Sequence, residues 1–390
     1  MKALHLVTMY LPLTEGWIYS QIADQNSLTS TVGAIHRSDI DYYPFPDTHV
    51  FTDQWPIFKR GKMRKLLYKF PQIAIYWLKH KLKQGSFDLL HCHFGDLGFY
   101  ALPLKKYLQI PMVTMFYGYD ATQLPAQKPI WRKRYLELFQ HGEIFLVEGN
   151  HMKKTLMKLG CPEEKIKIFH LGVDLQGIPS QAKYVQKGET LKLLAAGAFR
   201  EKKGLPYAIE AFAQAKQECE DMTLTVIGDS PGGDREEREK ERILQVVSHY
   251  NISDSVTFLG FQPHQRFIEE LQKHHLFISP SVVAEDGDTE GGSPVSITEA
   301  SAASLPIIST YHCDIPEVVL HESTGLLVKE KDINGLKESI LYFASHRDKV
   351  NTFGLNGRQH IADEYNLSKQ LIKLQSIYKD LLRKESMTYN

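Results

Sequence analysis

Residues 280–300 bring together side chains that suit a phosphate- and sugar-binding site: an acidic loop, a Gly-Gly-Ser-Pro turn and an apolar run compatible with a helix. A short apolar run at 275–279 precedes them, so we expect the order strand, loop, helix. The first turn of a helix carries unpaired N–H groups and a partial positive charge, which suit an anion such as a pyrophosphate. Gly291 and Gly292 let the backbone come close to a ligand, Ser293 follows them, and Pro294 suits the first helical turn.

Two carboxylates flank this turn. Glu290 precedes the glycines, and Glu299 lies further along the expected helix. A carboxylate at the second position can accept hydrogen bonds from the two hydroxyls of a ribose. The segment therefore predicts a nucleotide-sugar pocket. The alternative for Glu290 is a solvated acid in a loop.

The elements that must position this pocket are visible as short apolar runs that alternate with helix-length amphipathic segments. The expected strands are 3–9, 89–92, 112–116, 144–147 and 167–170 in the first half, and 191–196, 224–227, 255–258, 276–279, 307–309 and 325–328 in the second. Such runs, apolar throughout and separated by helices, predict parallel sheets covered on both faces. The polar stretch 172–192 predicts a linker. We therefore expect an α/β protein with two Rossmann-like, doubly wound domains, 1–175 and 188–366, followed by a C-terminal helix, 367–390.

Composition limits the class of protein. A chain of 390 residues with 43% hydrophobic and 24% charged residues fits two globular domains. The four cysteines have no metal-like spacing, which argues for reduced thiols and against a zinc site. The first residues are expected to form a buried strand and not a signal peptide, and no stretch has the length of a membrane span.

The charge is unevenly distributed along the chain. Residues 1–180 carry 22 Lys and Arg against 15 Asp and Glu, whereas residues 181–390 carry 24 against 31. A chain that is neutral as a whole is not typical of a nucleic-acid-binding protein. A positive first half suits an anionic acceptor or a membrane surface.

The acidic segment resembles the E-x7-E signature of retaining GT-B glycosyltransferases of family 4. The resemblance implies that the first Glu contacts the donor sugar and that the second binds the ribose. Eight residues, not seven, separate Glu290 from Glu299 here, and the position with the family spacing is Gly291. Either the loop carries one extra residue before Pro294, or a neighbour takes the role of Glu290. Glu299 is the firmer assignment.

Further motifs of the second half resemble the same family in order and spacing. Residues 197–204 are similar to its G-R-L-x-x-x-K-G element, in which an Arg and a Lys neutralise the donor diphosphate. Lys203 falls on the family Lys, whereas Ala198 falls on the Arg position and Arg200 lies two residues on. A cation here would stabilise the departing diphosphate; the alternative is a solvated basic turn. Gly228 matches a strand-ending glycine.

Two more elements of the second half fit this resemblance. Gly260 and Phe261 belong to a turn that resembles the family G-x-x-P, with Pro263 in place, where the base is held. Residues 310–317 and 323–328 are similar to the closing G-I-P-E and TGLLV elements. The motifs are weak singly, and it is their order across this half of the chain that indicates the family.

The first half matches the family less tightly. Gly16 and Trp17 follow the first strand, where relatives carry a loop near the acceptor, and Gly16 is assigned to the donor. His93 is the third residue of the sequence His-Cys-His-Phe-Gly, which ends an expected strand and resembles H-x-H-F-G. Tyr117 stands where the motif F-H-G-x-D has its His, and Asp120 is its final residue. Tyr117 can donate a hydrogen bond but is a poor base near neutral pH, and His93 is a possible substitute.

The resemblance implies a GT-B fold in which two domains face a cleft and the last helix crosses back to the first domain. It implies transfer of a hexose from a UDP- or GDP-sugar to a glycan or polyprenyl-linked acceptor, with no cofactor and no metal. His91 and His93 could form part of a metal site, but no third ligand is evident. Asp286 and Asp288 superficially resemble the D-x-D metal motif of the GT-A fold, which the two-domain pattern argues against.

Three other classes compete with this hypothesis. Ala198, Tyr117 and the shifted Glu spacing suggest a catalytically silent protein that binds nucleotide sugars. A nicotinamide-dependent oxidoreductase would need a G-x-G-x-x-G after the first strand, which the chain lacks. A non-hydrolysing sugar epimerase shares the fold, but the basic first half favours transfer to an acceptor.

The segment from Lys59 to Lys83 carries nine Lys and Arg and no acid, interleaved with aromatic residues. Basic and aromatic residues on amphipathic helices suit peripheral contact with an anionic membrane. The alternative is an ordinary basic helix pair with a buried aromatic stripe. The expected location is the cytoplasm, with the inner face of the cell membrane as the site of such contact.

Overall fold

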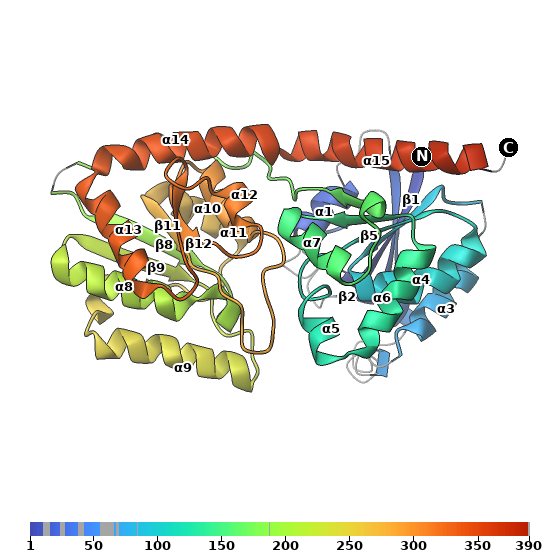
Figure 1. The fold of residues 1–390 in the computed structure, drawn as a ribbon, viewed down its shortest axis with the longest axis horizontal. Helices are drawn as coiled ribbons and strands as arrows, with labels where there is room; N and C mark the ends of the chain where they lie inside the picture. The colour runs from blue at the N-terminus through green and yellow to red at the C-terminus, as the bar shows by residue number, and fades with distance from the viewer. Residues whose placement is uncertain are drawn as a thin grey trace. The chain divides into compact units, whose positions relative to one another are not determined.

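The computed structural model describes residues 1–10, 16–23, 28–37, 43–54, 66–67, 70–83, 85–186 and 188–388. It divides into two compact units (Figure 1). Unit 1 comprises Met1–Gly172 together with Leu367–Asn390, and unit 2 is Val173–Asn366. The division falls at the start of the polar stretch 172–192. The polar stretch itself packs on unit 2, where Lys183 Nζ donates to the carbonyls of Leu271 and Gln272.

Unit 1 is built on a seven-stranded parallel sheet, here called sheet 1. Its strands, in sheet order, are β3 (Thr48–Val50), β2 (Thr29–Arg37), β1 (Lys2–Tyr10), β4 (Leu89–His93), β5 (Met112–Met115), β6 (Ile144–Val147) and β7 (Ile166–Ile168). Its described helices are α1 (Gly16–Ala23), η2 (Phe51–Gln54), α3 (Gln72–Lys81), α4 (Gly95–Leu108), α5 (Gln123–Gln127), α6 (Ile130–His141), α7 (Asn150–Lys158), η3 (Glu163–Lys165) and α15 (Leu367–Thr388). The last helix returns to this unit from the far end of the chain.

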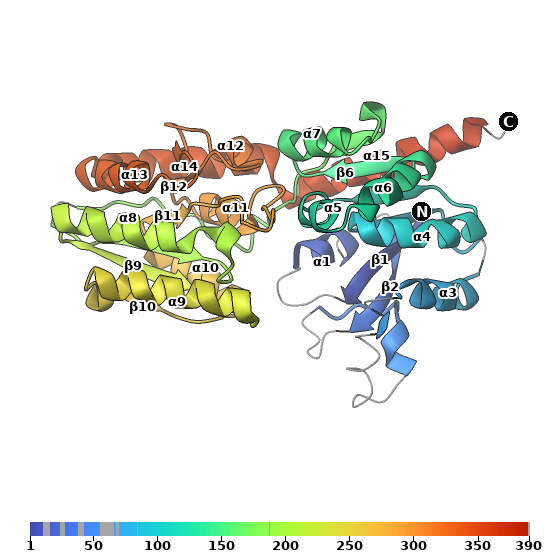
Figure 2. The same ribbon diagram turned by 60° about the horizontal axis from the view of Figure 1, so that its bottom comes forward.

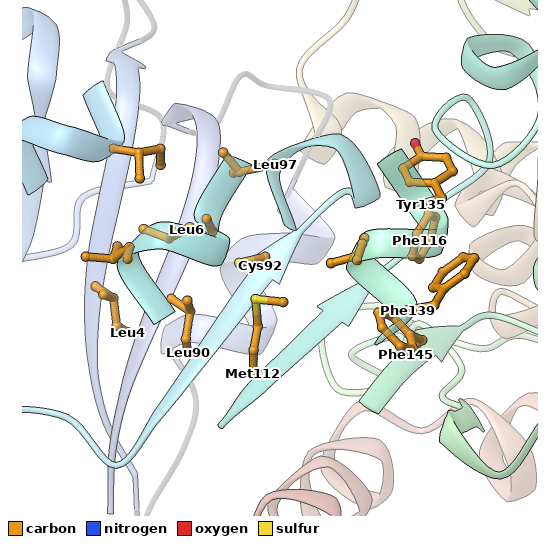
Figure 3. Packing of buried hydrophobic residues seen from close by; sticks show 14 of the residues in the cluster. Leu4, Leu6, Leu90, Cys92, Leu97, Met112, Phe116, Tyr135, Phe139 and Phe145 are labelled. Atoms are coloured by element: carbon orange, nitrogen blue, oxygen red, sulfur yellow. The ribbon is translucent and has the colours of Figure 1, made fainter. Parts of the chain in front are cut away.

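The two faces of sheet 1 are covered by different helices. Side chains of α3, α4, α6 and α7 pack in one apolar cluster, and those of α1 and α15 pack in another. Figure 3 shows the first cluster, with Leu6 of β1 on the left, Cys92 of β4 and Met112 of β5 in the middle, and the aromatic residues Phe116 and Tyr135 on the right. Because successive strand residues alternate between faces, the neighbours of these residues along β1 and β4 point into the cluster beneath α1 and α15.

Unit 2 repeats the design with a six-stranded parallel sheet, sheet 2. Its strands, in sheet order, are β10 (Val256–Phe258), β9 (Met222–Ile227), β8 (Leu191–Ala196), β11 (Leu276–Ser279), β12 (Ile307–Thr310) and β13 (Gly325–Val328). Its helices are η4 (Glu201–Lys203), α8 (Leu205–Glu218), α9 (Asp234–His249), η5 (Ser253–Ser255), α10 (His264–Lys273), α11 (Val295–Ala302), α12 (Ile315–Val318), α13 (Ile333–Ser345) and α14 (Arg347–Glu364). One apolar cluster takes residues from α8, α9 and α13 and the other from α10, α11 and α12, which lie on opposite sides of the sheet (Figure 2).

These two parallel sheets confirm the predicted α/β fold class, and every apolar run that we expected to be a strand contains one, with ends that shift by up to two residues. Two strands of sheet 1 were not predicted. β2 has Gly33 at its centre and polar residues at its start, and β3 is a three-residue strand at the edge. None of the described helices has both the length and the apolarity needed to cross a membrane.

Candidate active site

The motifs of the second half meet at one place in sheet 2. β8 and β11 are neighbours, although the chain builds β9 and β10 on one side before returning to β11. Such a reversal of strand order opens a crevice at the carboxyl ends of the strands, where α/β sheets bind ligands. The loop 197–204 follows β8 and the loop 280–294 follows β11, so both predicted donor loops leave the sheet at this point.

A lysine and a glutamate from these two loops form an ion pair. Lys203 Nζ lies 2.9 Å from Glu290 Oε2, with 20% and 6% of the two side chains exposed. The other oxygen, Oε1, accepts a hydrogen bond from Ser281 Oγ at 2.9 Å. Burial disfavours the charged carboxylate, but Lys203 and Lys202 outweigh it and lower the pKa of Glu290. The carboxylate is therefore charged at neutral pH beside a cation that can exchange it for a phosphate.

The basic loop also has a free cation and a glycine with a steric role. Arg200 is exposed and forms no ion pair with any described residue. Gly204 ends η4 with a φ of +64°, and a Cβ there would lie 1.9 Å from the carbonyl oxygen of Pro280. The loops after β8 and β11 are thus in van der Waals contact, which only glycine permits at this position.

The acidic loop is held by cations that the sequence did not single out. Arg235 of α9 contacts the carboxylates of both Glu201 and Asp286. Lys202 Nζ lies 3.1 Å from Asp288 Oδ1. Asp286 and Asp288, the D-x-D pair, are therefore engaged in ion pairs. Among the described residues, the group of side chains placed to hold a metal ion does not include them. Arg235 was missed because it lies in the mixed-charge run of residues 234–242, which is typical of a solvated helix.

Glu299 lies on α11, one turn into the helix that begins after Pro294. Its Oε1 accepts from His264 Nε2 at 2.7 Å, and this hydrogen bond raises the pKa of His264. The turn before the helix has Gly291 at a φ of +75°. Ser293 Oγ is buried and has no hydrogen-bond partner among the described residues. A buried hydroxyl without a partner beside a helix N-terminus is a ready contact for a polar ligand.

The predicted base-binding turn lies next to the strand-ending glycine. Gly228 N donates to the carbonyl oxygen of Gly260 at 2.9 Å. The φ of Gly228 is +133°, and a Cβ there would lie 2.0 Å from the carbonyl oxygen of Gly197. Phe261 follows this contact with 54% of its surface exposed. An exposed ring in the turn after β10 is suited to contact a base.

One further residue, His312, orders the loop that carries Glu290. Its side chain is buried after β12, its Nε2 lies 3.2 Å from Glu290 N, and its Nδ1 lies 2.7 Å from Glu330 Oε1. Because Nε2 accepts from a backbone N–H, Nδ1 carries the proton that is donated to Glu330. His312 was predicted only as part of the closing motif, and no role was predicted for its side chain.

The predicted residues of the first half meet at the corresponding point of sheet 1, where β1 and β4 are neighbours. Trp17 of α1 and Tyr117 have ring centroids 4.2 Å apart. Gly16 begins α1, and a Cβ there would lie 2.5 Å from the hydroxyl of Tyr43. The turn after β4 is strained at Phe94, whose φ is +78°. Thr14 and Glu15, which directly precede Gly16 in the sequence, lie outside the described residues.

His93 is fully buried and contacts Tyr117 instead of solvent. Its Nδ1 lies 2.6 Å from the Tyr117 hydroxyl, and its Nε2 lies 3.2 Å from His5 Nδ1. Burial lowers the pKa of His93 and of its neighbours His5 and His91, so the three rings are neutral near pH 7. A ligand that approaches from solvent is therefore reached by His93 only through Tyr117. His5 was missed because it lies far from the His-Cys-His motif in the sequence.

Asp120 is also buried, and its carboxylate accepts hydrogen bonds from the backbone. Its carboxylate accepts from Gly95 N at 2.7 Å and from the N–H groups of Tyr117 and Gly118 at 3.0 Å. Burial raises its pKa to about 7, and the three N–H groups limit the rise. Asp120 thus joins the loop after β5 to the start of α4, and it positions Tyr117 without facing solvent.

Comparison with known proteins agrees with this arrangement. The family description "Glycosyl transferases group 1" matches residues 179–360, and "Glycosyltransferase Family 4" matches residues 42–176. The amylovoran biosynthesis glycosyltransferase AmsK of Erwinia amylovora is 32% identical over 286 residues, which is 73% of this chain and 68% of that protein. WcaL of Escherichia coli (strain K12), which its name assigns to colanic acid biosynthesis, is 29% identical over 72% of this chain and 67% of its own length.

Solved structures share the fold at low sequence identity. HepE of Anabaena, crystallised with UDP and glucose, superposes with a TM-score of 0.76 at 16% identity and covers 97% of this chain and 100% of its own. Sucrose-phosphate synthase from Thermosynechococcus elongatus superposes with a TM-score of 0.73 at 17% identity, over 98% and 99% of the two chains. The family follows from three observations together: the two parallel sheets, the charged loops after β8 and β11, and the sequence identity to AmsK. The chain is a glycosyltransferase of family 4, with the group 1 glycosyl transferase region in its second half.

Proposed function

We propose that this glycosyltransferase is a retaining enzyme that transfers a hexose from a UDP- or GDP-sugar to a hydroxyl of a glycan or polyprenyl-linked acceptor. The observation that carries the proposal is the contact of Lys203 with Glu290 at the strand reversal of sheet 2. It joins a cation suited to a diphosphate and a carboxylate suited to sugar hydroxyls. The names of AmsK and WcaL support a role in cell-surface polysaccharide synthesis.

Residues of unit 2 are assigned to each part of the donor: the diphosphate, the sugar, the ribose and the base. Lys203 and Arg200 bind the diphosphate and stabilise the charge that grows on it as the glycosidic bond breaks. Glu290, released from Lys203, accepts hydrogen bonds from the sugar, and Glu299 accepts them from the ribose. Phe261 contacts the base. Because these cations supply the positive charge, the proposed reaction needs no metal and no cofactor.

The acceptor is assigned to residues of unit 1. In a retaining transfer of this kind the departing phosphate oxygen takes the proton of the acceptor hydroxyl on the same face of the sugar, so a strong protein base is not needed. The Tyr117 hydroxyl, held by His93, then serves as a hydrogen-bond partner for the acceptor. Trp17 offers an aromatic face, and Asp120 fixes the backbone of Tyr117.

We further propose that the enzyme works in the cytoplasm at the inner face of the cell membrane. Residues 59–65, 68 and 69 of the basic segment lie outside the described residues. In the described part, Phe70, Ile73 and Tyr76 are exposed, Tyr76 to 63%, whereas Trp77 packs against the core. Exposed apolar side chains beside the lysines of α3 support contact with anionic lipid.

The test is to incubate the full chain with UDP- and GDP-sugars, without metal, and to measure release of the nucleoside diphosphate. Release from one donor, raised by a lipid-linked acceptor and lost in Glu299→Ala, is the expected result. The anomeric configuration of the product, read by NMR, distinguishes retention from inversion. Binding without release, with every acceptor tried, would instead support a catalytically silent protein that binds nucleotide sugars, which the Ala at position 198 also suggests.

A further inference from the structure

Three histidines meet on one face of sheet 1. His5 of β1 lies opposite His91 of β4 in the parallel register, and His93 follows two residues later on the same face. The face is opposite to the one on which Leu6 and Cys92 pack in Figure 3. All three rings are fully buried. One ring nitrogen from each lies within 4.8 Å of the others.

Two of the rings are oriented from outside by tyrosine hydroxyls. His91 Nδ1 lies 2.5 Å from the hydroxyl of Tyr378 on α15, and His93 Nδ1 lies 2.6 Å from that of Tyr117. Both contacts engage Nδ1 and turn Nε2 of each ring toward the cluster. A histidine that binds a metal through one nitrogen almost always holds the other in a hydrogen bond of this kind.

One nitrogen on the inner side lacks the partner that burial calls for. His91 Nε2 is buried and has no hydrogen-bond partner among the described residues, which is unfavourable in a protein interior. His5 Nδ1 and His93 Nε2 are 3.2 Å apart. Two nitrogen ligands of one tetrahedral zinc ion lie about 3.3 Å apart, because each Zn–N bond is about 2.0–2.1 Å long.

We propose that His5, His91 and His93 bind a divalent transition-metal ion, with Zn²⁺ as the ion that fits best. Imidazole nitrogens select Zn²⁺ and its neighbours over Mg²⁺ and Ca²⁺, which take oxygen ligands. Three neutral ligands leave a fourth position for a water or hydroxide ion.

The proposed ion has a structural role. Its ligands join β1 to β4 and, through Tyr378, reach α15. The site contains none of the residues that we assign to the donor, so the proposal stands or falls independently of metal-free transfer. Only two of the three ligands, His91 and His93, are close in the sequence, so no third ligand could be predicted from it.

The first test uses the full chain with any purification tag removed. After treatment with a chelator, the protein is titrated with Zn²⁺, and bound metal is measured by mass spectrometry. We expect one Zn²⁺ per chain and a rise in Tm of about 5–10 °C when free Zn²⁺ is about 100 times its Kd. Co²⁺ should give the visible absorption of a four-coordinate ion. A wild-type chain that binds no stoichiometric metal and whose Tm does not change would overturn the proposal.

Variants locate the ion. His5→Gln and His91→Gln should abolish binding, whereas His49→Gln, at a partly exposed histidine of the same unit, should leave it unchanged. Tyr378→Phe should keep the stoichiometry but weaken binding about 10–100-fold, because it removes only the orienting hydroxyl. If His5→Gln does not fold, Tyr378→Phe and the wild-type titration still test whether the metal binds at this site. Binding that survives both glutamine variants would overturn the assignment.

Discussion

The strand reversals of the two sheets differ in chemistry although they occupy the same position in the fold. At β8 and β11 of sheet 2 the loops carry charges that are already paired, such as Lys203 with Glu290. At β1 and β4 of sheet 1 the groups are neutral: buried imidazoles bonded to the hydroxyls of Tyr117 and Tyr378. The strand reversal therefore carries paired charges in sheet 2 and neutral polar groups in sheet 1.

The difference indicates two kinds of ligand. Paired charges can be exchanged for those of an anionic ligand at little cost, since the desolvated cation keeps a partner throughout. The neutral groups of sheet 1 offer no such exchange. The Tyr117 hydroxyl suits the uncharged hydroxyls of a sugar, and the buried imidazoles are assigned above to a metal ion. In the functions proposed above, sheet 2 binds an anionic diphosphate, whereas the neutral groups of sheet 1 have no charge to offer such an anion, so substitutions in the two regions should have different effects.

The largest effect is expected for Lys203→Met. Without this cation the leaving diphosphate loses its main counter-charge, so kcat/KM for donor cleavage should fall about 10²–10³-fold. The single variant also leaves Glu290 buried without its ion-pair partner, so Lys203→Met/Glu290→Gln should melt closer to the wild type while remaining inactive. Lys337→Met, which breaks the Lys337–Glu218 pair on α13, is the matched control. Activity retained by the double variant would refute the role of the pair.

A smaller effect is expected for Glu299→Gln. The amide keeps the shape of the side chain but replaces one carboxylate oxygen by a donor, so UDP or GDP should bind about 10–100-fold more weakly. Calorimetric titration of the nucleotide measures this directly, with Glu269→Gln on the exposed face of α10 as control. Unchanged affinity would mean that Glu299 serves only to hold His264.

The next prediction is a loss of membrane binding by variants of unit 1, the unit with the excess of positive charge. Phe70→Ser/Tyr76→Ser should weaken sedimentation with vesicles of anionic lipid about tenfold, because two exposed aromatic rings are lost. The nucleotide affinity of unit 2 should stay unchanged. Leu136→Ser, at an exposed apolar residue of α6, should have no effect. Equal binding of all three proteins, or equal binding to neutral vesicles, would contradict a membrane-facing α3.

The smallest effect concerns the pH dependence of stability in unit 1. Burial raises the pKa of Asp120 to about 7, above the value of about 3.9 expected in an unfolded chain. The folded state then binds more protons between these values, so the free energy of unfolding should decrease as pH rises from about 4 to about 7. In Asp120→Asn this decrease should be smaller, although the variant is less stable overall. Urea unfolding of the wild type and of Asp120→Asn at several pH values tests this prediction. If the free energies of unfolding of the two proteins changed in parallel with pH, Asp120 would stay charged in the folded state.

The fold was predictable from the sequence because parallel strands buried on both faces leave continuous apolar runs. β8, β11 and β13 begin and end where their runs do. β2 escaped detection because Gly33 and the polar residues at its start weaken the strand pattern, and its burial comes from neighbours in space such as Leu6 and Leu78. A three-residue edge strand such as β3 leaves too short a pattern to find.

The candidate site was predictable where one motif carries the chemistry, and not where distant segments meet. Lys203 and Glu290 could be named separately, but their contact depends on β8 and β11 becoming neighbours. Arg235 and His5 were missed for the same reason, since each meets its partners only after the chain has folded. Asp120 was found by its motif, yet its burial against three backbone N–H groups could be seen only in the structure.

The return of α15 to unit 1 has a consequence for the order of folding during synthesis. Unit 2 is one continuous stretch of chain, whereas unit 1 lacks Leu374, Tyr378 and Leu381 of its core until the last helix has left the ribosome. Domains generally fold as units during synthesis, so unit 2 can be complete while the face of sheet 1 beneath α15 is still open. A chain that stops before residue 367 would keep that apolar face exposed, which makes it a target for chaperones and proteases.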